Sequence, residues 1–155
     1  MRLRRVGDVI VGQIALTLAP EATVQEAARR MRIAQVGSVM VVAADRLVGI
    51  FTERDGLFRV LAEGTNPNEV KLSQVMTTGV TTVRVDSLFV DALELMYEGG
   101  FRHVPVLDGD VPVGIVSIRD AMGQELEGFR FALQRQQEAL PDDATPSGDQ
   151  ADDTA

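Results

Sequence analysis

The sequence has no cysteine and no tryptophan, and only one histidine and one tyrosine among its 155 residues. Without cysteine there is no disulfide framework, no thiolate nucleophile and no thiolate zinc site. A single histidine leaves little for general acid–base chemistry, and without a second ligand of its kind it makes a poor metal site. We therefore expect neither an enzyme nor a metal centre. The lack of cysteine also suits the reducing environment of the cytoplasm.

Positive charge is scarce as well. The chain carries 15 Lys and Arg against 23 Asp and Glu, a net charge of −8, which argues against nucleic acid as a partner because that footprint requires clustered cations. Five of the negative charges lie in the last fifteen residues, so the remainder is only mildly acidic. Residues 141–155 contain no aromatic or branched apolar side chain. We expect this segment to be a disordered acidic tail.

Long apolar runs are also missing. None approaches the ~20 residues that a membrane-spanning helix needs, so we expect no membrane partner. Residues 1–5 read MRLRR before an apolar stretch, which imitates a signal peptide. However, Asp8 and Gln13 interrupt that stretch, and residues 6–10 resemble residues 72–76. We interpret the segment as part of the fold. A chain of this length that is 45% hydrophobic can build one compact domain.

The sequence is internally repeated. Residues 49–55 read GIFTERD, and residues 114–120 read GIVSIRD, an offset of 65. The register holds backward without a gap to Ala22 and Ser87, with ten identities over 34 positions. A fixed period indicates one structural unit used twice, and two copies are too few for a solenoid. We expect the copies to face each other around a pseudo-two-fold axis, with clefts between them as the candidate functional sites.

Each copy predicts the same order of elements. The first has a short strand over residues 14–18, then Thr23 with Glu26 three positions later, which is a capping-box pattern that starts a helix. Residues 39–43 and 47–52 predict a hairpin, and a second helix begins near Glu53 with Leu57, Val60 and Leu61 on one face. The second copy predicts a strand over 80–85, a helix over 88–98, strands over 103–107 and 111–117, and a helix from 118 that runs on to 139.

Strand–helix–strand–strand–helix, used twice, predicts an α+β architecture. We divide the chain into residues 1–68 (first repeat with linker), 69–124 (second repeat), 125–140 (C-terminal helix) and 141–155 (acidic tail). The helical spacing also predicts that Met31 and Met96 are core residues.

This order, with Gly-apolar-x-Thr/Ser-x-x-Asp closing each copy, resembles a tandem pair of CBS domains, the modules named after cystathionine β-synthase. The resemblance covers residues 6–124 and is strongest over 49–59, 71–77 and 101–106. The Thr-Glu-Arg-Asp form is similar to stand-alone bacterial CBS pairs. The resemblance implies a regulatory module that needs no cofactor, binds adenosine-containing ligands such as AMP, ADP, ATP, S-adenosylmethionine or NAD in clefts between the copies, dimerises, and modulates an effector protein.

The Thr/Ser-x-x-Asp motifs allow two interpretations. Thr52 with Asp55, and Ser117 with Asp120, stand where an N-cap and a third-position acid stabilise a helix start. The resemblance implies that each Asp instead accepts ribose hydroxyls through charge-assisted bonds, with further hydroxyl contacts from Thr52 and Ser117. The two roles are compatible, because the same helix start offers free N–H groups to an anion.

Arg102 and His103 are the sharpest difference between the copies, since their counterparts are Gly37 and Ser38. Resemblance to the gamma subunit of AMP-activated kinase implies that these positions reach the phosphate held in the opposite copy's cleft. Arg102 and His103 would then work with Asp55, and the clefts would bind phosphorylated ligands unequally. The alternative is that His103 merely starts a strand with its ring at the surface.

Adenine recognition is expected from backbone and apolar groups of the short first strands. The resemblance places Gly79 and Thr81 beside the Asp55 cleft, and Ile14 and Leu16 beside the Asp120 cleft with Ser38. Arg54 and Arg119 either add phosphate contacts or face solvent. The competing function is a ligand-independent structural or interaction module with degenerate clefts. In either case, the apolar residues of helices 23–32 and 87–97 predict a homodimer.

Overall fold

The computed structural model describes residues 3–122 and Arg135. Met1–Ala121 form one compact unit that contains both repeats. The expected helix over 125–140 and the expected tail over 141–155 lie outside the described residues, apart from Arg135. None of the described helices is long and apolar enough to cross a membrane.

The two halves of this unit contain the same elements in the same order. The first half comprises α1 (Val6–Val9), β1 (Thr17–Leu18), α2 (Val24–Ala34), β2 (Ser38–Ala43), β3 (Arg46–Thr52), α3 (Glu53–Asp55) and the π-helix η1 (Gly56–Leu61). The second half comprises α4 (Leu72–Val75), β4 (Val83–Arg84), α5 (Phe89–Gly99), β5 (His103–Asp108) and β6 (Val111–Ser117), and residues 118–122 are helical.

The two three-stranded sheets are copies of each other. Their strand orders are β1-β2-β3 and β4-β5-β6, and in each the first strand is parallel and the last antiparallel to the central strand. Even the register shift recurs, between Val41 and Val42 in one sheet and between Val106 and Leu107 in the other. The predicted α+β fold with a duplicated unit is therefore confirmed. Met31 and Met96 lie in the two cores as predicted.

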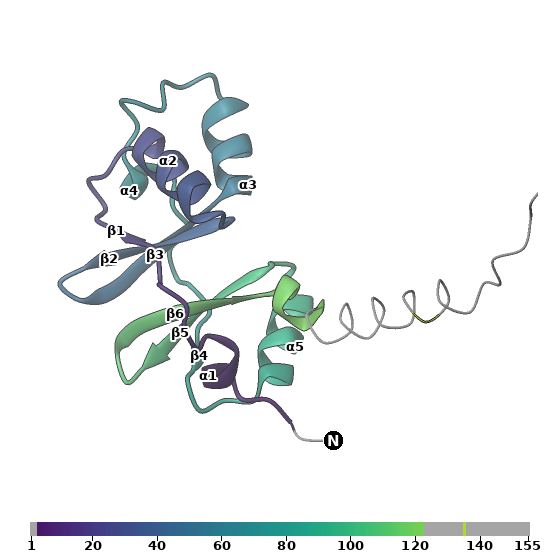
Figure 1. Ribbon diagram of the computed structural model, residues 1–155. Helices are drawn as coiled ribbons and strands as arrows, with labels where there is room; N and C mark the ends of the chain where they lie inside the picture. The colour runs from purple at the N-terminus through teal and green to yellow at the C-terminus, as the bar shows by residue number, and fades with distance from the viewer. Residues whose placement is uncertain (1–2, 123–134, 136–155) are drawn as a thin grey trace, which may run out of the picture. The chain divides into compact units, whose positions relative to one another are not determined.

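Each half donates its first helix to the other half's core. Val6 of α1 is fully buried beside Val83 and Phe89, whereas Leu72 and Val75 of α4 are buried in the core of the first repeat. Figure 1 shows α1 beside α5, and α4 beside α2. The likeness between residues 6–10 and 72–76 is thus structural, and because the helices are exchanged, each core needs residues from both halves.

The first strand of each repeat is shorter than the sequence predicts. β1 contains only Thr17 and Leu18, although Leu16 C=O still accepts a bond from Met40 N–H at 3.0 Å, so the expected strand over 14–18 begins three residues too early, and Ile14 is 94% exposed. In the second repeat only Val83 and Arg84 pair, in place of 80–85. The residues before each short strand leave the ladder, and residues 77–82 run past β3 instead, where Thr77 pairs with Ile50.

The helix after β3 begins at Glu53 as predicted, but it widens after Asp55 into the π-helix η1. The bond from Ala62 N–H to Leu57 C=O spans five residues, a spacing that moves side chains off the α-helical face. Val60 is buried, while Leu57 is 50% and Leu61 is 70% exposed. The three residues that were predicted on one face of the helix therefore differ in burial.

Candidate functional site

Thr52 and Asp55 form a hydrogen-bonded pair at the turn from β3 into α3. Thr52 is the N-cap of α3, and its Oγ1 accepts a 3.3 Å bond from Asp55 N–H. In return, Asp55 Oδ2 accepts bonds from Thr52 N–H at 2.9 Å and Thr52 Oγ1 at 3.2 Å. The capping interpretation is thus confirmed. Asp55 is also buried, with a relative exposure of 9%, so the helix start holds a carboxylate largely out of water.

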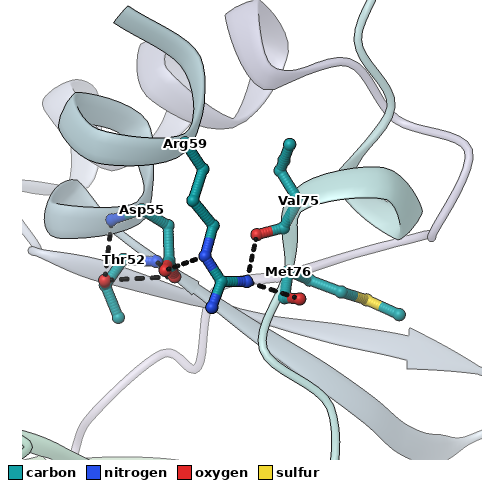
Figure 2. A network of polar contacts seen from close by, with 5 residues as sticks. All are labelled: Thr52, Asp55, Arg59, Val75 and Met76. Atoms are coloured by element: carbon teal, nitrogen blue, oxygen red, sulfur yellow. Dashed lines mark hydrogen bonds and ion pairs between the residues drawn. The ribbon is translucent and has the colours of Figure 1, made fainter. Parts of the chain in front are cut away.

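The second oxygen of this carboxylate faces Arg59, one turn further along the helix. Arg59 Nε lies 3.5 Å from Asp55 Oδ1, and its Nη1 donates to the carbonyls of Val75 at 3.0 Å and Met76 at 3.1 Å (Figure 2). Arg59 is not among the site residues predicted from the sequence. Its only signal was an arginine four residues after an aspartate, a spacing at which opposite charges meet on a helix.

Residues 77–81 approach β3 from the other side. Thr77 N–H donates to Ile50 C=O at 2.9 Å, and Ile50 N–H donates to Thr77 C=O at 3.0 Å. Gly49 makes this approach possible, because a Cβ there would lie 2.5 Å from Met76 Sδ and 3.0 Å from Thr77 O. Beyond Thr77 the chain turns at Gly79, where φ is +63°. This local geometry brings the loop that contains Gly79 and Thr81 alongside the end of β3.

Arg102 and His103 enter from the second repeat at the start of β5. The main chain there is fixed by the bond from Ile118 N–H to Arg102 C=O at 3.0 Å. His103 is the first residue of β5 and is partly buried. It lies against Gly37, where a Cβ would come within 3.3 Å of His103 Nε2 and 2.9 Å of Glu53 Oε1.

Burial lowers the pKa of His103 below its ordinary value of 6.5. The nearby guanidinium groups of Arg119 and Arg102 lower this pKa further, while the carboxylates of Glu53 and Asp120 oppose the shift. His103 is therefore mainly neutral at pH 7. An anion placed beside it would favour the imidazolium form and raise the pKa again.

These features surround one cavity of about 860 Å³. It includes all six residues predicted for the Asp55 cleft: Thr52, Asp55, Gly79, Thr81, Arg102 and His103. The other lining residues are Ile50, Glu53, Arg54, Leu57, Phe58, Thr77, Val80, Gly100 and Phe101. Arg54 also lies over the Phe58 ring, 5.3 Å from its centroid. The cavity thus combines apolar and aromatic walls with a buried carboxylate and three basic side chains, which suits a ligand with a flat apolar part, hydroxyls and an anion.

The residues predicted for the second cleft are arranged differently. Asp120 Oδ2 accepts bonds from Ser117 N–H at 2.6 Å and Ser117 Oγ at 3.2 Å, which reproduces the turn of the first repeat. Ser38 is buried at the start of β2, opposite Thr52. Ile14 is exposed and Leu16 partly buried. None of these five lines the large cavity or a second cavity of about 280 Å³ beside Arg46 and Asp110.

At the edge of β6 a side chain replaces the main-chain pairing seen at β3. Gln13 Nε2 donates to Ile115 C=O at 2.9 Å, and Ile115 N–H donates to Gln13 Oε1 at 2.8 Å. They correspond to the two main-chain bonds between Thr77 and Ile50 in the first repeat. Among the residues that the structure describes, no group of three acidic or histidine side chains is placed to hold a metal ion.

Comparison with known proteins identifies the family to which this chain belongs. The family model described as the CBS domain matches twice, over residues 6–61 and 72–126. An uncharacterised protein of Methanopyrus kandleri is 37% identical over 124 residues, which cover 76% of this chain and 63% of that protein. A CBS domain-containing protein of Bacillus subtilis is 35% identical over 115 residues, 74% of this chain and 81% of that protein. An Arabidopsis thaliana CBS domain-containing protein is matched over only 19% of its length.

Solved structures show the same fold. A CBS-domain containing protein of Agrobacterium tumefaciens superposes with a TM-score of 0.72 at 32% identity, covering 79% of this chain and 99% of that one. A Pyrobaculum aerophilum CBS domain protein complexed with AMP has a TM-score of 0.71 at 22% identity, over 84% and 99% of the chains. A CBS domain pair in complex with 5′-methylthioadenosine and S-adenosylmethionine has a TM-score of 0.71 at 24% identity, over 83% and 99%. With both of its repeats matched by the family model, this chain belongs to the CBS domain family.

Proposed function

We propose that this chain is a regulatory module that binds a phosphorylated adenosine ligand, such as AMP, in the cavity beside Asp55. One observation carries the proposal. The cavity gathers a buried carboxylate from the first repeat with Arg102 and His103 from the second, and its volume of about 860 Å³ lies within the range of roughly 300–1,000 Å³ that is typical of small-molecule sites.

Each part of such a ligand has a chemical counterpart in the cavity. The Asp55 carboxylate can accept hydroxyls of a ribose, because each carboxylate oxygen offers two lone pairs and only some of them are used within the turn. Arg102 and Arg54 supply positive charge for a phosphate, and His103 can add a charge when the phosphate raises its pKa. Phe58, Phe101 and their apolar neighbours offer surface for a base. The CBS structures solved with AMP and with S-adenosylmethionine support this ligand class, since they share the fold.

A second role suits the Asp120 side. There Gln13 occupies the strand edge with its own amide, and the residues of the first repeat that correspond to Arg102 and His103 are Gly37 and Ser38, which carry no charge. We infer that this side does not hold a phosphorylated ligand and serves the structure of the module. If the Asp55 cavity proves equally inert, the chain is a ligand-independent interaction module.

Regulation requires a surface to which other protein chains can bind, and α2 and α5 supply such a surface. Ile33 is 77%, Val90 is 52% and Tyr97 is 88% exposed on these helices. We infer that they pair two copies into a homodimer and that the ligand changes how the module docks on an effector protein in the cytoplasm. The chain itself is not a catalyst in this proposal. Light scattering at tens of micromolar checks the dimer, and a monomer mass would contradict it.

The ligand proposal is tested by calorimetric titration of the protein with AMP, ADP, ATP, S-adenosylmethionine and NADH. We expect at least one phosphorylated adenosine ligand to bind with one main site per chain, and Asp55→Ala to weaken it. If none of the five binds at millimolar concentration, the sensing function is wrong and the interaction module replaces it.

A further inference from the structure

Arg59 does not line the cavity, yet it joins two of the cavity's walls. One wall is the helix start with Thr52 and Asp55, and the other is the chain that leaves α4 and continues to Thr81. The guanidinium reaches both, through Asp55 Oδ1 at 3.5 Å and the carbonyls of Val75 and Met76 at 3.0 and 3.1 Å (Figure 2). Along the main chain these two walls are far apart, separated by about twenty residues of η1, the linker and α4.

The planar fork of an arginine suits this double task, since its nitrogens point in fixed directions and can serve a carboxylate and carbonyls together. The carbonyls of Val75 and Met76 lie at the end of α4, where a helix leaves C=O groups without intrahelical partners. Arg59 therefore satisfies the end of α4 while it holds one side of the Asp55 carboxylate. Thr52 holds the other oxygen. With both ends fixed, the carboxylate presents a defined set of free lone pairs to the cavity.

The equivalent position in the second repeat carries no cation. The offset of 65 aligns Arg59 with Gln124, although Asp55 aligns with Asp120. A glutamine side chain has no charge to pair with a carboxylate, so positions 120 and 124 cannot repeat the Asp55–Arg59 ion pair. The natural glutamine also supplies the substitution with which to test the arginine.

We propose that Arg59 is a positioning residue of the Asp55 cavity. It orients the Asp55 carboxylate toward ligand hydroxyls and clamps residues 75–81 at the distance that closes the cavity. The ligand part of this inference rests on the proposed function, whereas the clamp is a property of the unliganded protein. Ligand affinity then depends on Arg59 through Asp55, and the mobility of the 75–81 wall depends on Arg59 even without ligand.

The clamp is tested by amide hydrogen exchange of the unliganded full-length chain. Arg59→Gln is expected to speed exchange of the Thr77 amide about tenfold relative to wild type, because Thr77 is held to Ile50 next to the carbonyls that lose their donor. Arg84→Gln is the matched control, since it removes an exposed arginine paired with Asp86 at 3.3 Å on β4, outside the cavity. Unchanged exchange at Thr77 in Arg59→Gln would overturn the clamp.

The positioning role is tested by a double-mutant cycle with AMP. Arg59→Gln is expected to weaken AMP about three- to tenfold, a modest loss because the Arg59 side chain is 49% exposed and solvent screens its charge. Introduced into Asp55→Asn, the same change should cost less than about twofold, since the group it orients is already neutral. Losses that simply add in the double variant would show that Arg59 acts independently of Asp55 and would overturn the positioning role.

The ligand chosen separates this inference from the function on which it rests. With 2′-deoxy-AMP, the penalty of Arg59→Gln should shrink, because the ligand hydroxyl that the oriented carboxylate would accept is missing. If wild type binds none of AMP, ADP, ATP, S-adenosylmethionine and NADH at millimolar concentration, the proposed function fails together with the positioning role. The exchange experiment then still decides whether Arg59 clamps the wall.

Discussion

Thr52–Asp55 and Ser117–Asp120 are the same turn in two surroundings. In both, the aspartate Oδ2 accepts a main-chain N–H and a hydroxyl, at nearly equal distances. Around the first turn lie Arg59, the Thr77 main chain and the basic pair from β5. The second turn has Gln13 at its strand edge. The same turn thus caps a helix in both repeats, and the residues that surround it differ.

The duplicated cores show the opposite behaviour. Both sheets keep their strand order, pairing and register shift, and both cores accept a helix from the other half. Identities such as Ala27 with Ala92 and Val41 with Val106 lie in these cores. The two halves are therefore similar in their hydrophobic cores and different in the residues around the cavity.

Substituting each aspartate in turn is expected to give the largest difference in AMP affinity between the two turns. We expect Asp55→Ala to weaken AMP about ten- to a hundredfold, because a hydrogen bond to a charged group contributes roughly 1.5–3 kcal/mol. Asp120→Ala should change the affinity less than about threefold. Isotherms for both variants measure this, with thermal melts to confirm folding, since each substitution also removes a helix cap. Equal losses for the two variants would contradict an unequal pair of clefts.

The two strand glycines sharpen the comparison in terms of stability. A Cβ at Gly49 would meet the Thr77 carbonyl at 3.0 Å besides Met76 Sδ, whereas one at Gly114 would meet side-chain atoms of Gln13 and Ile10 at 2.9 and 3.0 Å. Main chain yields less easily than side-chain ends, so we expect Gly49→Ala to lower the free energy of unfolding by about 1–3 kcal/mol. Gly114→Ala should cost less than about 1 kcal/mol.

Urea denaturation of both variants measures these free energies. Gly49→Ala should also weaken AMP, because it displaces the wall that contains Thr77, while Gly114→Ala should leave AMP binding unaltered. A larger destabilisation by Gly114→Ala would mean that Gln13 is held as firmly as the main chain of Thr77.

The sequence predicted the fold well because packing and duplication leave strong patterns. Apolar spacing marked the helices with Met31 and Met96, and the offset of 65 aligned both hairpins. It failed where three-dimensional partners decide. Ile14 is apolar but is not part of a strand, and Leu57 and Leu61 are exposed whereas Val60 is buried. Nothing in the sequence shows that the helices near residues 6 and 72 exchange cores.

The candidate site was likewise predicted only in part. Thr52 and Asp55 were recognised because their spacing is a local motif, and Arg102 and His103 because the repeat alignment exposed them as an asymmetry. Arg59 was missed, since its bonds to Val75 and Met76 join residues sixteen and seventeen positions apart, and no local pattern predicts such bonds. Glu53 was also missed as a cavity residue.

Arg102 tests the anionic part of the ligand. We expect Arg102→Ala to weaken AMP about five- to tenfold and adenosine less than twofold, because the substitution removes positive charge opposite a phosphate that adenosine lacks. The side chain is exposed, so solvent screening keeps the effect below that of Asp55→Ala. Titration of the variant with both ligands checks the ratio. An Arg102→Ala protein that keeps the wild-type preference for AMP over adenosine would place the phosphate elsewhere.

The smallest expected effect is that of pH on AMP binding through His103. The pKa of His103 lies below 6.5 in the unliganded protein, chiefly because of burial, and a bound phosphate would raise it, so binding takes up a proton. Between about pH 7 and 5.5 the affinity of wild type for AMP should therefore rise about threefold relative to that of His103→Gln. The ratio of the two proteins is the quantity to measure, because the phosphate of AMP itself protonates near pH 6 and weakens both.

Stability without ligand should move in the opposite direction. Because the folded state lowers the pKa of His103, the neutral ring contributes fully above about pH 6.5, and this contribution is lost as the pH falls through the lower folded-state value. Wild type should thus lose more stability than His103→Gln on acidification, while AMP narrows the gap. The facing charges of Glu53, Arg102, Arg119 and Asp120 are present in both proteins, so the difference isolates the ring. Parallel stability profiles for the two proteins, with and without AMP, would show that His103 neither titrates in this range nor meets the phosphate.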